Sequence, residues 1–377
     1  MNSSPVVITG SGLAAPADTI SNAELVASLS VAVERWNAEH ADEIARGECM
    51  ARHLPDEEFI VKASGIRSRH VVERSGILDP DRMRPHLPMR SEDELGIQAE
   101  MSIPPILAAL TQAGRQPHDV DAIIVGCSNL QRAYPAVSIE IQDAIGARGW
   151  AYDMNVACSS ATFAIQAGVD ALRNHSADCV VVVNPEITSG HNNFGMRDFH
   201  FIFGDACTAV VLERADEAVA PERWEVLGTR LATKFSNTIR NDFGFLNASE
   251  DGVRDPDELV FRQRGQQVFR EVCPMVATHI TDHLASLSIE ASSVRRFWLH
   301  QANLKMNQLI AKSVLGRVPD EDEAPVVLDE FANTSSAGSI IAFHQHRSDL
   351  AAGDLGVICS FGAGYSVGSV VVRNLAH

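Results

Sequence analysis

Short apolar runs alternate along the chain with longer segments of helical spacing. A recurrence of apolar positions every three to four residues predicts helices over 97–113, 159–173, 262–287 and 303–315. Runs rich in valine and isoleucine predict buried strands at 6–9, 121–126, 179–183, 208–212, 296–299 and 356–360. This alternation is typical of an α/β protein whose sheets are covered on both faces.

Two patterns repeat along the chain with the same offset of about 175 positions. AIIVGCSN at 122–129 and RFWLHQAN at 296–303 are each a buried strand that ends in a polar loop with an asparagine. YDMNVACSSATFAI at 152–165 and VLDEFANTSSAGSI at 327–340 are each a strand, a sharp turn and the start of a helix. Because two independent pairs agree, we predict a duplicated α/β unit.

The duplication predicts two halves that meet at a polar connection. The N-terminal half covers 1–218 and the C-terminal half covers 219–377, with the boundary in ERADEAVAPER. The segment from about 30 to 95 is polar, weakly periodic and rich in arginine and aspartate, which indicates helices and loops inserted over the core.

Charge and cysteine content exclude several classes of protein. Acidic residues outnumber basic ones by 49 to 31, and a formal net charge of −18 argues against a nucleic-acid-coating protein. No apolar run approaches the roughly 20 residues that cross a bilayer. Seven scattered cysteines without a C-x-x-C pair predict neither a disulfide framework nor a zinc site. We therefore expect a cytoplasmic protein without a membrane segment.

Cys158 is the first candidate for chemistry. An apolar strand runs into NVACSSA, and small apolar residues then follow at helical spacing. A thiol at the positive end of a helix has its pKa lowered from about 8.5 towards neutrality, and free backbone N–H groups there can hold an oxyanion. The alternative is a small buried core cysteine, which is our interpretation of Cys179 in its valine strand.

His300 and Asn333 strengthen the case for a site. His300 follows the strand RFWL, and Asn333 occupies the repeat position that matches Cys158. Ligands of α/β sheets bind at strand ends, so we expect these three groups to converge. A papain-like protease uses the same residue types, but the C-G-S-C-W context near the N-terminus is missing here. We expect no metal, because His344 and His346 lack ligand spacing and carboxylate neighbours.

At these residues the sequence resembles β-ketoacyl-acyl carrier protein synthase III, within the thiolase-fold condensing enzymes. Beside the nucleophile segment, the resemblance rests on SGIRSRH (64–70), FGDA (203–206), HQANL (300–304), NTSSA (333–337) and FGAGY (361–365). It implies a five-layered αβαβα thiolase fold, a homodimer, and a catalytic triad of Cys158, His300 and Asn333.

The resemblance also implies two half-reactions in fatty acid or related biosynthesis. Cys158 takes an acyl group from an acyl-coenzyme A, while the N–H groups of Cys158 and Ala363 hold the oxyanion. Malonyl on an acyl carrier protein then loses carbon dioxide, and His300 and Asn333 stabilise the enolate that attacks the acyl-enzyme. Coenzyme A thioester is a substrate in this scheme, and no cofactor is needed.

By position, further residues match the coenzyme A path of the family: Arg197, Asn303, Gly265, Phe269 and Phe59. Phe59 stands where relatives carry a tryptophan that stacks on adenine. Ala63 stands where an arginine helps to hold the nucleotide. This changed entrance leads us to expect a medium-chain acyl-coenzyme A rather than acetyl-coenzyme A.

Three more residues complete the expected site. Lys305 and Lys312 are seven positions apart on one predicted helix face, which suits an acidic carrier protein. Tyr134 matches the aromatic residue that reaches across the dimer to the partner's acyl pocket. Alternatives to a condensing enzyme are a thiolase-fold acyltransferase that forms esters or amides, and a non-condensing thioester hydrolase or subunit.

Overall fold

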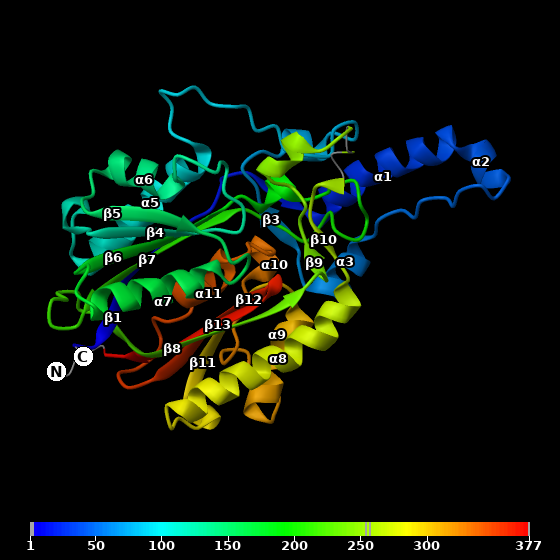
Figure 1. The fold of residues 1–377 in the computed structure, drawn as a ribbon. Helices are drawn as coiled ribbons and strands as arrows, with labels where there is room; N and C mark the ends of the chain where they lie inside the picture. Colours follow the sequence, from blue (N-terminus) through cyan, green and yellow to red (C-terminus); the bar gives the residue numbers. More distant parts are fainter. Residues whose placement is uncertain (1–3, 253–254, 256–257, 376–377) are drawn as a thin grey trace.

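One curved nine-stranded sheet organises the protein (Figure 1). The computed structural model describes residues 4–252, 255 and 258–375. The strand order is β11-β12-β13-β8-β1-β7-β6-β4-β5. These strands are β1 (Val6–Ala14), β4 (Ala122–Gly126), β5 (Trp150–Met154), β6 (Cys179–Glu186), β7 (Ala206–Arg214), β8 (Trp224–Ser236), β11 (Val294–Leu299), β12 (Leu355–Gly362) and β13 (Gly364–Asn374).

The two predicted halves each supply a continuous part of this sheet. β1, β7, β6, β4 and β5 come from the first half, and β8, β13, β12 and β11 come from the second. The halves join where β1 pairs with β8 over only two residue pairs, Val7–Glu225 and Ile8–Trp224. The predicted boundary at 218/219 falls in the connection between β7 and β8.

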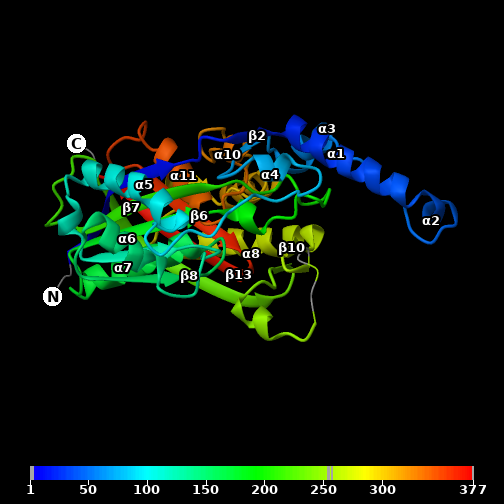
Figure 2. The ribbon, with the colours of Figure 1, turned by 90° about the horizontal axis from the view of Figure 1, so that it is seen from above.

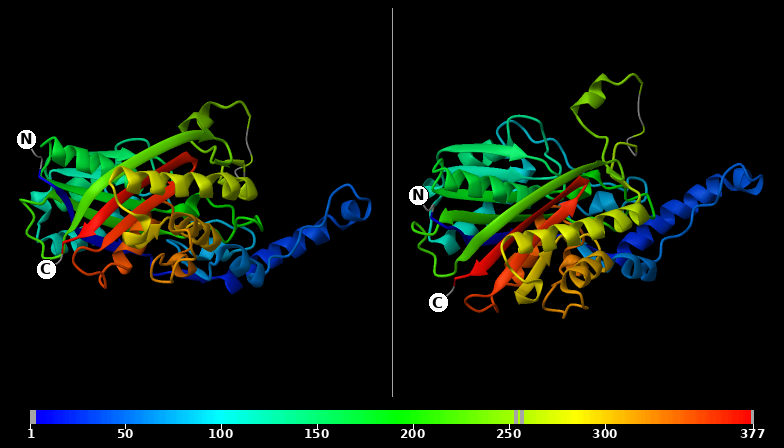
Figure 3. Two further views of the ribbon diagram at one scale, coloured as in Figure 1. Left: turned by 90° about the horizontal axis from the view of Figure 1, so that it is seen from below. Right: turned by 60° about the horizontal axis from the view of Figure 1, so that its bottom comes forward.

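Helices cover the outer face of each half of the curved sheet, and two more helices lie between the halves. α7 (Ser160–Arg173) and α11 (Ala337–Gln345) each contact strands of both halves, so they form a middle layer. α5 (Ile97–Ala113) and α6 (Val137–Ile145) pack on the outer face of the first half, while α8 (Gly265–Ser286) and α9 (Leu304–Leu315) accompany the second. The two halves of the curved sheet thus alternate with three helical layers, which matches the predicted αβαβα order. Figure 3 shows the outermost of these helices, α8, in yellow across the strands of the second half.

The predicted elements agree closely with the observed ones. Each valine-rich run lies in a strand because its side chains are buried on both faces; all eight residues of β6 are buried. The sequence did not predict β8, whose burial is mixed. In the described part of the chain, no helix is long and apolar enough to cross a membrane.

Only part of the segment from about 30 to 95 lies over the core as predicted, where Ile60, Ile66, Val71 and Ile77 are fully buried. α1 (Asn22–Glu39) buries Leu25, Leu29 and Val33 near its base, but its far end and α2 (Ala41–Ala45) project from the body (Figure 2). The chain returns through a loop in which Arg52 stacks on Trp36, 4.1 Å from the ring centroid. The first part of the inserted segment therefore extends away from the core.

The remaining elements are short. The strands and α-helices among them are β2 (Thr19–Ser21), β3 (Ser68–His70), β9 (Ile239–Arg240), β10 (Arg262–Gln263), α3 (Glu57–Ser64), α4 (Ser75–Leu78) and α10 (Leu328–Phe331). Short segments of 3-10 helix are η1 (Pro117–Asp119), η2 (Thr188–His191), η3 (Phe245–Ser249) and η5 (Ala291–Ser293). β2 pairs with β3, and β9 pairs with β10. Of these, α3 and the β9–β10 pair border the site described next.

Candidate active site

Cys158 lies in the turn between β5 and α7. The turn is held by its own polar groups, because Asn155 Oδ1 accepts from the Ala157 N–H at 2.9 Å and Ser160 Oγ accepts from the Val156 N–H at 2.9 Å. Ala157 has a φ of +48°, a left-handed conformation that turns the chain sharply just before the thiol. The residue is partly exposed and lines the cavity described below.

Asn333 lies in the corresponding turn of the second half, between α10 and α11. Its N–H donates to the Ile202 carbonyl at 2.9 Å, and its Oδ1 accepts from the Ser335 N–H at 2.9 Å. Ala332 has a φ of +56°, as Ala157 has beside Cys158. The amide oxygen therefore already accepts a hydrogen bond, and the amide NH₂ remains as a donor towards the cavity that Asn333 lines.

His300 follows β11 and completes the group. Its N–H donates to the Cys359 carbonyl of β12 at 2.8 Å, and its ring stands edge-on to Phe361 with centroids 5.2 Å apart. Burial lowers the pKa of His300 to about 4, against the opposing effect of the Ser335 carbonyl. The imidazole is therefore neutral at pH 7.

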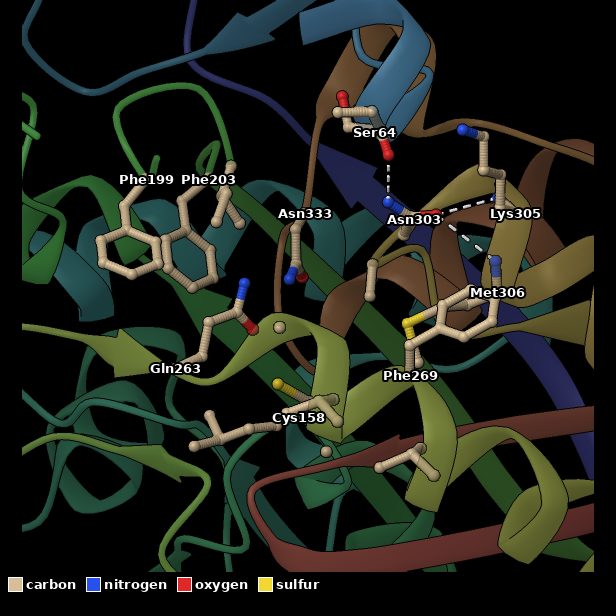
Figure 4. A pocket seen from close by; sticks show the side chains of 18 of the residues that line it. Ser64, Cys158, Phe199, Phe203, Gln263, Phe269, Asn303, Lys305, Met306 and Asn333 are labelled. Carbon is tan, nitrogen blue, oxygen red and sulfur yellow. Dashed lines mark hydrogen bonds between the residues drawn. The ribbon is translucent and has the colours of Figure 1, made fainter. Parts of the chain in front are cut away.

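Cys158, His300 and Asn333 all line one cavity of about 970 Å³. Figure 4 shows Cys158 and Asn333 directed into it, together with Gln263 from β10. Three rings form an aromatic wall: Phe203 lies 4.7 Å from Phe261 between centroids, and Phe199 lies 6.0 Å from Phe261. The structure thus brings the predicted triad together beside an apolar space.

The pKa of the Cys158 thiol differs from our expectation. Burial, the largest cause, raises this pKa to about 11, and the buried Glu186 carboxylate raises it further. The Ser335 side chain and the N–H groups of Ala363 and Cys158 act in the opposite direction. α7 begins at Ser160, two residues after Cys158. The expected shift towards neutrality was wrong for the free enzyme.

The turn between β12 and β13 closes over Cys158. A Cβ at Gly362 would lie 2.6 Å from Cys158 Cβ and 2.9 Å from Sγ, so only glycine fits there. Ser366 joins this turn to the residues around Cys158. Its hydroxyl lies within donating distance of the Ala363 carbonyl, at 3.0 Å, and of Ser159 Oγ, at 2.9 Å. The predicted oxyanion donors, Cys158 and Ala363, accordingly lie beside the same sulfur.

The residues expected along the coenzyme A path lie at or near the cavity mouth. Gly265, Phe269, Phe59 and Asn303 line it. Asn303 also caps α9 through the N–H groups of its first turn and donates to the Ala63 carbonyl at 2.7 Å. Arg197 stacks on Phe59, 4.6 Å from its ring centroid, and does not itself line the cavity.

The last three predicted residues are exposed. Lys305 lines the cavity rim, and Lys312 lies two turns further along α9. Tyr134, in the loop before α6, is 85% exposed and does not line this cavity. Among the described residues, no group of three or more His, Cys, Asp or Glu side chains could hold a metal ion.

Sequence reasoning missed two polar residues near the thiol. Glu186 ends β6 and is fully buried, and Gln263 reaches the cavity from a two-residue strand. A signal for Glu186 was present, because it follows the run CVVVVNP just as His300 follows RFWL. Gln263 had no comparable signal, since its segment has no periodic pattern.

Comparisons with known proteins agree with this geometry. Family models described as 3-oxoacyl-[acyl-carrier-protein] synthase III and its C-terminal part match residues 152–234 and 284–374. The chain is 56% identical to a β-ketodecanoyl-[acyl-carrier-protein] synthase of Pseudomonas aeruginosa over 347 residues, 92% of this chain and 99% of the relative. It is 28% identical to a β-ketoacyl-[acyl-carrier-protein] synthase III of Bartonella bacilliformis over 322 residues, 84% and 90% of the two chains.

Solved structures share the fold. The synthase III structures of Aquifex aeolicus and Thermus thermophilus each superpose with a TM-score of 0.75 at 20% identity, covering 98% of this chain and 99% of theirs. This likeness confirms the predicted thiolase fold. The chain therefore belongs to the 3-oxoacyl-[acyl-carrier-protein] synthase III family of acyl-transferring condensing enzymes.

Proposed function

We propose that the protein condenses a medium-chain acyl group from acyl-coenzyme A with malonyl-acyl carrier protein. The convergence of Cys158, His300 and Asn333 on one aromatic-walled cavity carries this proposal. In the first half-reaction Cys158 attacks the thioester, and the thiol proton ends on the sulfur of the departing coenzyme A. The N–H groups of Cys158 and Ala363 would hold the oxyanion that forms.

In the second half-reaction, malonyl-acyl carrier protein loses carbon dioxide and its thioester carbonyl becomes an enolate. Neutral His300 and the amide NH₂ of Asn333 are proposed to donate hydrogen bonds to that oxygen. The low pKa of His300 supports this role, because a neutral ring stays a neutral donor as negative charge develops. The enolate carbon then attacks the acyl group on Cys158, the carbon–sulfur bond breaks, and Cys158 leaves as a thiolate that takes a proton from solvent.

The proposed primer is octanoyl-coenzyme A. The P. aeruginosa relative is named for a β-ketodecanoyl product. Decarboxylative condensation lengthens the primer by two carbons, so a ten-carbon product requires an eight-carbon primer. The aromatic wall of Phe199, Phe203 and Phe261 offers apolar surface to such a chain.

Binding roles follow the same proposal. Phe59 and Arg197 would contact the nucleotide end of coenzyme A, with Gly265, Phe269 and Asn303 along its arm. We propose a cytoplasmic homodimer in which the exposed Tyr134 reaches the acyl pocket of the partner subunit. A Tyr134→Gly variant that remains dimeric should then accept longer primers, whereas an unchanged length profile would leave Tyr134 with a packing role.

A panel of acyl-coenzyme A substrates from acetyl to dodecanoyl tests the function. Each is incubated with malonyl-acyl carrier protein, and the carrier products and carbon dioxide are measured by mass. We expect β-ketodecanoyl-carrier from octanoyl-coenzyme A as the major product. Free fatty acid without carrier product would identify a hydrolase, and transfer to an added alcohol or amine would identify an ester- or amide-forming acyltransferase.

A further inference from the structure

Glu186 is a buried carboxylate between two turns, the one that carries Cys158 and the one that carries Asn333. These are called the catalytic turns below. Glu186 ends β6, its side chain is fully buried, and the ion pairs of the described residues do not include it. Burial raises the pKa of this carboxyl, while hydrogen bonds from Ser128 and Ser336 oppose the rise. Because a buried carboxylate without a paired cation is costly, its stability in the fold depends on the hydrogen bonds that it accepts.

Those hydrogen bonds come from one serine of each half and from the Cys127 thiol, whose Sγ donates to Oε2 at 3.5 Å. Glu186 Oε1 accepts from the Ser128 N–H at 3.0 Å and from the Ser336 N–H at 3.1 Å. Oε2 accepts from Ser128 Oγ at 2.6 Å, and the Ser336 hydroxyl donates to Oε1. One carboxylate therefore clamps the end of β4 to the start of α11.

Each serine leads directly to a catalytic turn. The Ser128 carbonyl accepts from Asn155 Nδ2 at 2.8 Å, and Asn155 in turn holds the Ala157 N–H before Cys158. Ser336 closes the turn that begins at Asn333, in which Asn333 Oδ1 accepts from the Ser335 N–H. The two turns come from different halves, and Glu186 links them through side-chain and backbone hydrogen bonds.

We propose that Glu186 is a positioning residue that sets the distance between the acyl-carrying thiol of Cys158 and the enolate held at Asn333. The proposal rests on the function proposed above. Carbon–carbon bond formation requires both partners in contact, whereas decarboxylation alone requires only the enolate side. A displaced turn would therefore allow the enolate to take a proton instead, giving acetyl-acyl carrier protein and carbon dioxide without condensation.

Glu186→Gln is the main test because it keeps the size of the side chain. At the Oε1 position its NH₂ group would face the N–H groups of both Ser128 and Ser336, and at the Oε2 position it would face the Ser128 N–H, which lies 3.2 Å from Oε2. Either orientation therefore sets two donors against each other at the end of the side chain. We expect condensation to fall about a hundredfold. We also expect the ratio of β-ketoacyl product to carbon dioxide to fall and acetyl-carrier to accumulate. Loss of folded enzyme would lower both products together and leave that ratio unchanged.

Two further variants serve as comparison and control. Glu186→Asp keeps both acceptor oxygens and should restore part of the ratio. Glu213→Gln alters an equally buried glutamate, which binds Thr9 and Arg115 away from the cavity, and should keep the wild-type ratio. Thermal denaturation reports whether each variant is folded.

The outcomes separate this proposal from the one on which it rests. An unchanged ratio in folded Glu186→Gln would overturn the positioning role, as would an equal fall in Glu213→Gln. If Glu186→Gln does not fold, Ser336→Ala decides, and a wild-type ratio there would overturn the role. If the wild-type protein forms no β-ketoacyl product at all, the proposed function fails and the positioning role fails with it.

Discussion

Replacing Gly362 by alanine tests how tightly the β12–β13 turn is fitted to the thiol. The new Cβ would lie 2.6 Å from Cys158 Cβ, about 0.8 Å closer than the 3.4 Å at which ordinary van der Waals contact begins. The thiol or the turn that carries Ala363 must move by a comparable distance. Because a misplacement near 1 Å costs about a hundredfold in rate, we expect acyl transfer to Cys158 to fall by that factor.

The assay measures the rate at which octanoyl-coenzyme A adds an acyl group to the protein, by intact mass. Overpacking of this kind also costs about 1–3 kcal/mol of stability, so thermal denaturation is recorded in parallel. Gly244→Ala is the matched control, because a Cβ there meets nothing within 4 Å. Acylation of a folded Gly362→Ala protein within threefold of the wild-type rate would refute the close fit.

The remaining predictions concern the thiol, the enolate donors and the carrier. Acyl-coenzyme A should modify Cys158 alone, and an adduct found on another cysteine by peptide mapping would contradict this. Alkylation of Cys158 by iodoacetamide should rise about tenfold per pH unit between 7 and 10, because burial raises the pKa of the thiol to about 11 and keeps most of it protonated throughout that range. A plateau near pH 8 would contradict the burial argument. His300→Ala and Asn333→Ala should still acylate but release carbon dioxide from malonyl-acyl carrier protein about a hundred- to a thousandfold more slowly, the usual cost of one lost oxyanion donor; wild-type release would remove both from the mechanism. Reversing the charges of Lys305 and Lys312 should raise the KM for the carrier substrate and leave acylation from acyl-coenzyme A unchanged, whereas equal loss of both would argue against docking there.

The sequence by itself predicted six strands of the sheet, four of the helices, and a repeat that relates the two halves. Valine runs such as 179–183 predicted strands correctly because a strand buried on both faces needs apolar side chains at every position. The repeat placed Cys158 and Asn333 at equivalent points, and each indeed lies in a turn with a left-handed residue before it. His300 could be found because it is a polar residue directly after an apolar run.

Only the tertiary structure decided the pKa of the Cys158 thiol and which distant residues line the cavity. A local pattern shows a thiol near a helix start, but it does not show how much protein surrounds the sulfur, and burial raised the pKa that proximity to the helix was expected to lower. Likewise, Phe203 and Gln263 reach the cavity from separate segments with no shared pattern. The burial of the sulfur and the lining of the cavity depend on how segments far apart in the sequence pack together. Periodicity within one segment carries no information about that packing.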